Sequence, residues 1–286
     1  MTALLAAGVA LASAGAAEAQ PPPALPAAAN GRVAHRVAVR IARRGPRPAA
    51  GRGERWAHRL MARRFRAAGL SVRTQRFAVP GKGRSRNVIG VLNTRARCLR
   101  ILMAHADTTA SAPGANDNAS GVGVLAALAP RLRRARPRCD TWLVAIGAEE
   151  RIYTGSPDHL GALALAGRVR RRGLARRLDW ALSLDEVGRD RPFWLRAPVA
   201  GPRRGVERLM LAAGRRAGVG VEFVADEGTG NSDHREFNLF GLPAAKLGVG
   251  AGGEPCRHLP CDVPGRLRRT SLAQAQRLAE VAVRLR

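Results

Sequence analysis

Residues 99–107 read LRILMAHAD, an apolar run that ends in a histidine and an aspartate. The part at 99–104 has the length of a short strand, and the continuous apolar residues at 101–104 are typical of a strand buried on both faces. Similar runs occur at residues 142–146 and 181–184, and acidic residues follow each of them. These segments predict a buried sheet whose strands end in polar side chains.

Apolar runs and segments of helical periodicity alternate through the rest of the chain. The predicted strands are residues 72–79, 88–92, 99–104, 142–146, 181–184, 221–224 and 244–249. The predicted helices are residues 31–44, 54–69, 120–134, 156–165, 205–218 and 270–286. Continuous apolar strands separated by helices predict one α/β domain over residues 31–286, with a mostly parallel, mixed central sheet and helices on both faces.

The charge of the chain is strongly unbalanced. Its 286 residues include 49 Lys and Arg but only 21 Asp and Glu, which gives a formal net charge of +28. The arginines are scattered in short runs such as Arg170–Arg172, and aromatic residues make up only 4% of the chain. Proteins that bind single-stranded nucleic acid combine a basic groove with stacking aromatic side chains. We therefore interpret the charge as a compositional bias toward arginine and expect no nucleic-acid partner.

The N-terminus resembles a signal peptide. An apolar stretch at residues 3–17 leads to Ala17-Glu18-Ala19, which has the form of an A-x-A cleavage site. The stretch is too short to span a membrane. Residues 1–19 therefore predict a signal peptide and a secreted protein, and residues 20–30 predict a Pro- and Ala-rich linker. Because no Lys or Arg precedes the apolar stretch, a disordered Ala-rich tail is the alternative.

The four cysteines form an even set, which suits an exported protein with disulfides. Cys256 and Cys261 bracket a short loop, while Cys98 and Cys139 each stand shortly before a predicted strand. These positions favour the pairs Cys256–Cys261 and Cys98–Cys139. Four reduced thiols in the core are the alternative.

Acids and histidines gather where the predicted strands end. In open α/β sheets, ligands bind beyond the carboxyl ends of the strands. Five acids and two histidines fall at these exits: His105, Asp107, Asp117, Glu149, Glu150, Asp185 and His258. Histidine nitrogens and carboxylate oxygens are zinc ligands, and this set is too large for one tetrahedral ion and about sufficient for two. The pattern predicts a site for two metal ions.

The motifs that carry these residues resemble those of the M28 zinc peptidases. They are His105-Ala106-Asp107, GANDNASG at residues 114–121, Gly147 to Glu150, Leu184-Asp185, Ser232-Asp233-His234, and Arg257-His258 with Asp262 following. The six motifs occur in the order of the family. The resemblance implies a zinc-exopeptidase fold and a hydrolase that releases residues from the N-termini of peptides or proteins, with carboxypeptidase or dipeptidase action as alternatives. Because the short chain shows no segment for a lid or for dimerisation, we expect a monomer.

The resemblance also implies two zinc ions and assigns their ligands. Asp117 would bridge both ions. His105 and Asp185 would complete one site, and Glu150 and His258 would complete the other.

Two further acids receive roles from the resemblance. Glu149 would be the general base, and the bend that separates it from the strand would be formed by Gly147 and Ala148. Asp107 would hold the imidazole of His105 from behind and make it a better ligand.

His234 competes with His258 for the last ligand position. In the family the ligand is the later histidine, so the resemblance favours His258. We expect His234 and Asp233 to shape the substrate pocket or to support the site, and we interpret His159 as a surface histidine on a helix.

Arg257 departs from the family pattern, in which an aromatic residue often precedes the last histidine. Its guanidinium can donate to a developing oxyanion, bind a substrate carboxylate or point to solvent. A Cys256–Cys261 disulfide would fix the backbone around His258.

Two other functions use the same scaffold. A glutaminyl cyclase-like acyltransferase would bind a single zinc ion, whereas a non-catalytic binding domain would have lost ligands. His105 together with the Glu149 and Glu150 pair favours two ions, and the complete set of five ligands and a base favours catalysis.

Overall fold

The computed structural model describes residues 27–150, 159–189, 192–198, 204–226, 228 and 230–285. The predicted signal peptide at residues 1–19 lies outside these ranges. Among the helices in the described ranges, none has both the length and the apolar character that a membrane-spanning segment requires.

The described strands form one mixed sheet of eight strands in the order β1-β2-β4-β3-β5-β8-β6-β7. Their bounds are β1 Ser71–Val79, β2 Gly83–Leu92, β3 Leu99–His105, β4 Asp140–Ile146, β5 Leu178–Asp185, β6 Phe193–Pro198, β7 Val221–Asp226 and β8 Ala244–Gly248. The central strands β4, β3, β5 and β8 run parallel. At one edge β2 runs antiparallel to both β4 and β1, and near the other edge β6 pairs antiparallel with β8. The predicted mostly parallel, mixed sheet is confirmed.

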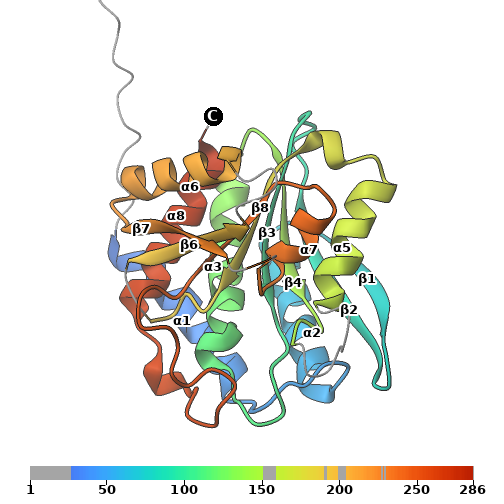
Figure 1. Ribbon diagram of the computed structural model, residues 1–286, viewed down its shortest axis with the longest axis vertical. Helices are drawn as coiled ribbons and strands as arrows, with labels where there is room; N and C mark the ends of the chain where they lie inside the picture. The colour runs from blue at the N-terminus through green and yellow to red at the C-terminus, as the bar shows by residue number, and fades with distance from the viewer. Residues whose placement is uncertain are drawn as a thin grey trace, which may run out of the picture.

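Helices cover both faces of the sheet, as predicted (Figure 1). Their bounds are α1 Ala27–Ala42, α2 Arg52–Ala67, α3 Gly121–Ala135, α5 Leu160–Arg171, α6 Arg204–Ala217, α7 His234–Leu239 and α8 Arg269–Arg284. Helices α1, α2, α3, α6 and α8 contribute to one hydrophobic cluster, and α5 and α7 contribute to the other.

The side chains of β3 explain why residues 101–104 are apolar at every position. Every residue of β3 is buried. Leu102 and Ala104 belong to the cluster under α1 and α3, whereas Ile101 and Met103 belong to the cluster under α5 and α7. Because successive side chains of a strand point to opposite faces, a strand covered on both faces needs apolar residues at every position.

Two elements were not predicted. Strand β6 contains Arg196 and ends at Pro198, so no continuous apolar run marks it in the sequence. Helix α7 has only six residues, which is too short for a periodic pattern. Other elements differ at their ends: α1 begins at Ala27 rather than Gly31, and α5 continues to Arg171.

Both predicted disulfides are present, and no described cysteine is free. Cys98–Cys139 joins the segments that lead into β3 and β4, at the opposite ends of these strands from His105 and Glu149. Cys256–Cys261 closes a short loop after β8. The Cα atoms lie 4.9 and 5.4 Å apart, within the usual range for a disulfide.

We expect the double substitution Cys98→Ala, Cys139→Ala to lower the free energy of unfolding by about 4 kcal/mol, because the bridge spans 41 residues of the unfolded chain. Urea unfolding of the oxidised protein and of the double variant measures the difference. A loss below about 1 kcal/mol would contradict a stabilising role of the bridge.

Candidate functional site

The ends of the central strands and the loops that follow them surround one cavity of about 420 Å³. Of the predicted site residues, the following line it: His105, Asp117, Glu149, Glu150, Asp185, His234, Arg257 and His258. Asp107 and Asp233 are buried but do not line the cavity. The predicted residues therefore come together at one edge of the sheet, although they are spread over more than 150 positions of the sequence.

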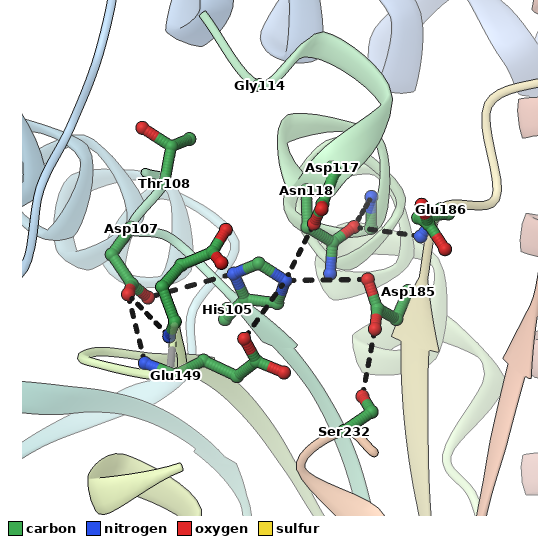
Figure 2. Close-up of polar contacts among 12 residues, drawn as sticks. His105, Asp107, Thr108, Gly114, Asp117, Asn118, Glu149, Asp185, Glu186 and Ser232 are labelled. Carbon is green, nitrogen blue, oxygen red and sulfur yellow. Dashed lines mark hydrogen bonds and ion pairs between the residues drawn. The ribbon is translucent and has the colours of Figure 1, made fainter. Parts of the chain in front are cut away.

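Five of these residues form two groups of potential metal ligands, and both groups contain Asp117. They are called donor groups below, because each residue offers one nitrogen or oxygen atom to a metal ion. In one group, His105 Nε2 lies 3.1 Å from Asp117 Oδ1 and 3.4 Å from Asp185 Oδ1. In the other, His258 Nε2 lies 3.3 Å from Asp117 Oδ2 and 3.0 Å from Glu150 Oε2. The donor atoms of each group lie within 4.8 Å of one another. Figure 2 shows His105 facing Asp117 and Asp185, with Asp107 on its other side.

A third combination of donors overlaps with these two groups. It joins His105 with Glu149 and Glu150, again with the donor atoms within 4.8 Å. Glu149 Oε2 is 4.0 Å from His105 Nε2, which is farther than Asp117 or Asp185. Glu149 is therefore the more distant carboxylate around His105, and it is not a member of the two groups that contain Asp117.

The charge of the site suits bound cations. Many carboxylates are buried here: Asp107, Asp117, Glu149, Glu150, Asp185, Glu186 and Asp233. Burial raises the pKa of Glu150 to about 7, and the pKa of Glu149 is raised well above its usual value for the same reason. Hydrogen bonds with Asp117 and Glu150 raise the pKa of His258 to about 10. Bound metal ions would favour the deprotonated form of these groups, because metal ions bind deprotonated ligands.

Several donor atoms of the site also lack a hydrogen-bond partner within the described residues. They include His105 Nδ1, Glu150 Oε1 and Asp185 Oδ1. Buried polar atoms normally have a partner, so these atoms need water or a ligand. The donor set, the excess of carboxylates and these open atoms all fit a metal centre of nitrogen and oxygen ligands.

Asp262 holds the turn that presents Asp117. Its two carboxylate oxygens accept hydrogen bonds from the backbone N–H groups of Asn116 (2.8 Å) and Asp117 (2.9 Å). On the other side of the turn, Asn118 donates to the carbonyl of Leu184 (2.9 Å), at the end of β5. The peptide bond between Asp117 and Asn118 is cis. These contacts fix Asp117, which both groups share, between the disulfide loop and the sheet.

Gly114 makes this turn possible. Its φ is +60°, in the left-handed region that favours glycine. A Cβ atom here would lie 2.2 Å from the side chain of Thr108 and 2.4 Å from the carbonyl oxygen of Asp117. Only glycine fits such a close approach.

Arg47 binds the backbone of the loop between His105 and Gly114. It was not predicted as a site residue. Its buried guanidinium donates to the carbonyl oxygens of Ala106 (2.9 Å), Pro113 (2.6 Å) and Gly114 (3.0 Å). Burial lowers its pKa to about 10, although nearby carboxylates such as Asp107 oppose this. The loop is thus fixed to the segment that precedes α2.

Two buried acids hold the bend at the end of β4. Asp107 Oδ2 accepts the backbone N–H groups of Glu149 (2.9 Å) and Glu150 (3.1 Å). Glu54 Oε1 accepts the N–H of Ala148 (3.0 Å), whose φ of +53° produces the bend. Burial raises the pKa of Glu54 to about 8. The bend predicted at residues 147–148 is therefore present, and both glutamates that follow it line the cavity.

Asp107 has this contact in addition to the one predicted with His105. Its Oδ1 lies 3.7 Å from His105 Nδ1, which is longer than a hydrogen bond. The shorter contacts of Asp107 go to the backbone, so in this structure it orients the segment of Glu149 and Glu150 more closely than it orients the imidazole.

The Ser232-Asp233-His234 motif lies behind Asp185. Ser232 Oγ donates to Asp185 Oδ2 (2.8 Å), and Lys246 Nζ lies 2.8 Å from the same oxygen. His234 Nε2 lies 2.6 Å from Asp226 Oδ2 and belongs to neither donor group. Thus His258, and not His234, lies with Asp117 and Glu150.

Arg257 forms an ion pair with Glu186, which was not among the partners that the sequence suggested for it. Its Nε donates to Glu186 Oε1 (2.7 Å) and its Nη2 donates to Oε2 (2.5 Å). Lys246 Nζ is 3.6 Å from the same carboxylate. Glu186 and Lys246 line the cavity but were not predicted, because neither belongs to a motif that the sequence made conspicuous.

His159 is not a surface histidine, and this prediction was wrong. The residue precedes α5, is buried, and lines the cavity. The helical periodicity of α5 could not show this, because the side chain points back toward Glu149 (3.6 Å between His159 Nε2 and Glu149 Oε1).

Residues 87–283 match the sequence model of peptidase family M28. The chain belongs to this family. The matched segment contains every predicted site residue, and it confirms the resemblance drawn from the six motifs.

Two sequence relatives illustrate the membership. Aminopeptidase YwaD from Bacillus subtilis is 28% identical over 213 residues, which cover 70% of this chain and 44% of that protein. A probable zinc metalloprotease from Leptosphaeria maculans is 35% identical over 152 residues, which cover 50% of this chain and 31% of that protein. The chain thus aligns with less than half the length of each.

Solved structures share the M28 fold. A zinc aminopeptidase from Bacillus subtilis has a TM-score of 0.77 at 18% identity, covering 89% of this chain and 94% of that structure. Glutaminyl cyclase from Bacteroides thetaiotaomicron, bound to N-acetylhistamine, has a TM-score of 0.76 at 18% identity, covering 90% and 98%. At these identities the similarity establishes the fold.

We expect Asp262→Ala to weaken zinc binding to the purified protein by about 10- to 100-fold, because the backbone N–H groups of Asn116 and Asp117 each lose their acceptor. Competition with a chromogenic chelator measures the affinity. Asp262→Asn keeps one carbonyl acceptor and should lose less. Unchanged affinity in Asp262→Ala, with an unchanged circular dichroism spectrum, would show that the turn at residues 116–117 keeps its conformation without Asp262.

Proposed function

We propose that this protein is a di-zinc aminopeptidase that releases N-terminal residues from peptides. The observation that carries the proposal is the pair of donor groups that share Asp117, with Glu149 beside them. Membership of peptidase family M28 and the names of the aminopeptidase relatives support the reaction class.

In this proposal His105, Asp117 and Asp185 hold one zinc ion, and Asp117, Glu150 and His258 hold the other. When bound, the two ions would polarise the scissile carbonyl group and make water acidic enough to react near neutral pH. The side chains supply carboxylate oxygens and imidazole nitrogens, which are ligands that zinc accepts. Lys246 and Ser232 would keep Asp185 oriented through its other oxygen.

Glu149 would act as the general base. It lines the cavity, is almost fully buried, and lies outside the two donor groups that contain Asp117. Its carboxylate would take a proton from the attacking water and deliver it to the leaving amine. The raised pKa of Glu149, caused mainly by burial, suits a group that must hold this proton during the reaction.

The cavity favours an exopeptidase. Its volume of about 420 Å³ lies at the small end of the range of ligand pockets, which suits one terminal residue better than a long internal segment. The pair of Arg257 and Glu186 forms part of its wall, so Arg257 would act on substrate only by exchanging this partner.

Glutaminyl cyclase activity is the competing proposal on the same fold. The fold does not separate the two activities, because a glutaminyl cyclase and an aminopeptidase match this chain equally well. Two complete donor groups, with His105 and His258 in separate groups, favour two ions and hence the peptidase. Export of the chain remains a prediction from residues 1–19.

We expect the zinc-loaded protein to release nitroaniline from at least one aminoacyl-nitroanilide in a panel of substrates, and to lose this activity with a chelator and regain it with zinc. Metal analysis should give two zinc ions per chain. One zinc ion together with cyclisation of an N-terminal glutamine peptide would favour the cyclase. Activity that survives complete metal removal would exclude the whole scheme.

We expect Glu149→Gln to keep both zinc ions and to lower kcat by at least about 100-fold, since the amide cannot accept the proton. Metal analysis and initial rates on the same preparation provide the test. Glu222→Gln, at an exposed position of β7, is the matched control and should leave kcat unchanged. Retained turnover in Glu149→Gln would place the base elsewhere.

A further inference from the structure

His159 lies between two buried glutamates on the side of Glu149 that faces away from His105. Its Nε2 is 3.6 Å from Glu149 Oε1, and its Nδ1 is 3.2 Å from Glu236 Oε1. The other oxygen of Glu149, Oε2, faces His105 at 4.0 Å. The two oxygens of the proposed base therefore face different partners: one faces the donor groups and the other faces the imidazole of His159.

The fold holds this imidazole firmly. His159 has a left-handed backbone (φ +51°) immediately before α5, and its carbonyl accepts the N–H of Leu163 (2.9 Å). Glu236 lies on α7, which packs against α5 on the same face of the sheet (Figure 1). His159, Glu149 and Glu236 are all buried. The packing of α5 against α7 therefore brings the two side chains together.

The neighbours of Glu236 decide which way the hydrogen bond runs. Arg235 Nη1 also donates to Glu236 Oε1 (2.7 Å), so this oxygen accepts and His159 Nδ1 must be the donor. A hydrogen bond at Nδ1 fixes the plane of the ring and directs Nε2 toward Glu149. Nε2 can donate to the Glu149 carboxylate when the ring carries a proton on both nitrogens, as an imidazolium between two carboxylates does. This is the arrangement by which a carboxylate orients a histidine for a task at its other nitrogen.

We propose that His159, oriented by Glu236, is a positioning residue for the general base Glu149. By holding Oε1, it would restrict the carboxylate to rotamers in which Oε2 points to the cavity, where the attacking water must lie. The distance of 3.6 Å is longer than a hydrogen bond, and contacts of catalytic groups commonly shorten once substrate is bound. This inference rests on the proposed peptidase function and adds two residues to its machinery.

The test uses two substitutions of His159 in the zinc-loaded full chain. His159→Phe fills the same space without a polar atom and should lower kcat by about 10- to 100-fold, with KM changed by less than about twofold and the zinc content unchanged. His159→Gln keeps a polar group and should recover part of the lost kcat. His35→Ala, on α1 away from the cavity, is the control and should behave like the wild type.

A double-mutant comparison tests whether Glu236 acts through His159. Glu236→Gln alone should lower kcat by a smaller factor than His159→Phe. Adding it to His159→Phe should cause no further loss, because its effect depends on the imidazole.

Three results would overturn the inference: wild-type kcat in His159→Phe, loss of zinc that accounts for the whole defect, or losses of His159→Phe and Glu236→Gln that simply multiply. If His159→Phe does not fold, His159→Gln decides the question by the same split between kcat and KM. A wild-type protein that is inactive with zinc on every peptide substrate would reject the proposed function instead, so the two failures are distinct.

Discussion

The site depends on the carboxylate of Asp117, whose two oxygens face two groups of donors from one backbone position. Oδ1 lies 3.1 Å from the imidazole of His105, and Oδ2 lies 3.3 Å from that of His258. Because both groups share this side chain, a rotation of its turn would disturb them together. Asp262, which follows the disulfide loop, accepts hydrogen bonds from the turn, and Asn118 of the turn donates to Leu184 at the end of β5. The position of the turn therefore depends on how the loop packs onto the sheet.

Other parts of the site are held in the same way, by buried side chains that bind the backbone. Asp107 accepts from the N–H groups of Glu149 and Glu150, Glu54 accepts from Ala148, and Arg47 donates to carbonyl groups of the loop after β3. Strands that end in bends leave backbone groups without ladder partners, and buried groups of this kind need partners. Charged side chains fill that need with strong hydrogen bonds. The ligands are therefore oriented by a second layer of ionisable residues.

The charges explain why this chain concentrates its few acids at one edge of the sheet. The protein carries a net charge of +28, yet its site contains a surplus of buried carboxylates. Lys246 and the pair of Arg257 with Glu186 compensate only part of the site. Burial raises the pKa of Glu150 to about 7, so the charge of this carboxylate is costly unless a cation lies beside it. A pair of zinc ions would supply the missing charge, and His159 would then keep the proposed base distinct from the ligands.

The sequence by itself determined the buried strands, since a strand covered on both faces must be apolar at each position, as residues 101–104 are. It also determined the edge at which the site lies, because parallel strands bring their carboxyl ends together. Both disulfides followed from the positions of the cysteines. The family resemblance then assigned the individual ligands, and it favoured His258 over the more conspicuous His234.

Only the tertiary structure decided which polar groups contact the residues of the site from the surrounding elements. Glu54 and Ala148 are 94 positions apart, and His159 and Glu236 are 77 positions apart, so no local pattern connects them. The partner of Arg257 and the burial of His159 depend on how α5, α7 and the disulfide loop pack around the cavity. Local periodicity reports the face that an element buries, whereas the partner of a polar side chain is set by elements that arrive from elsewhere in the chain.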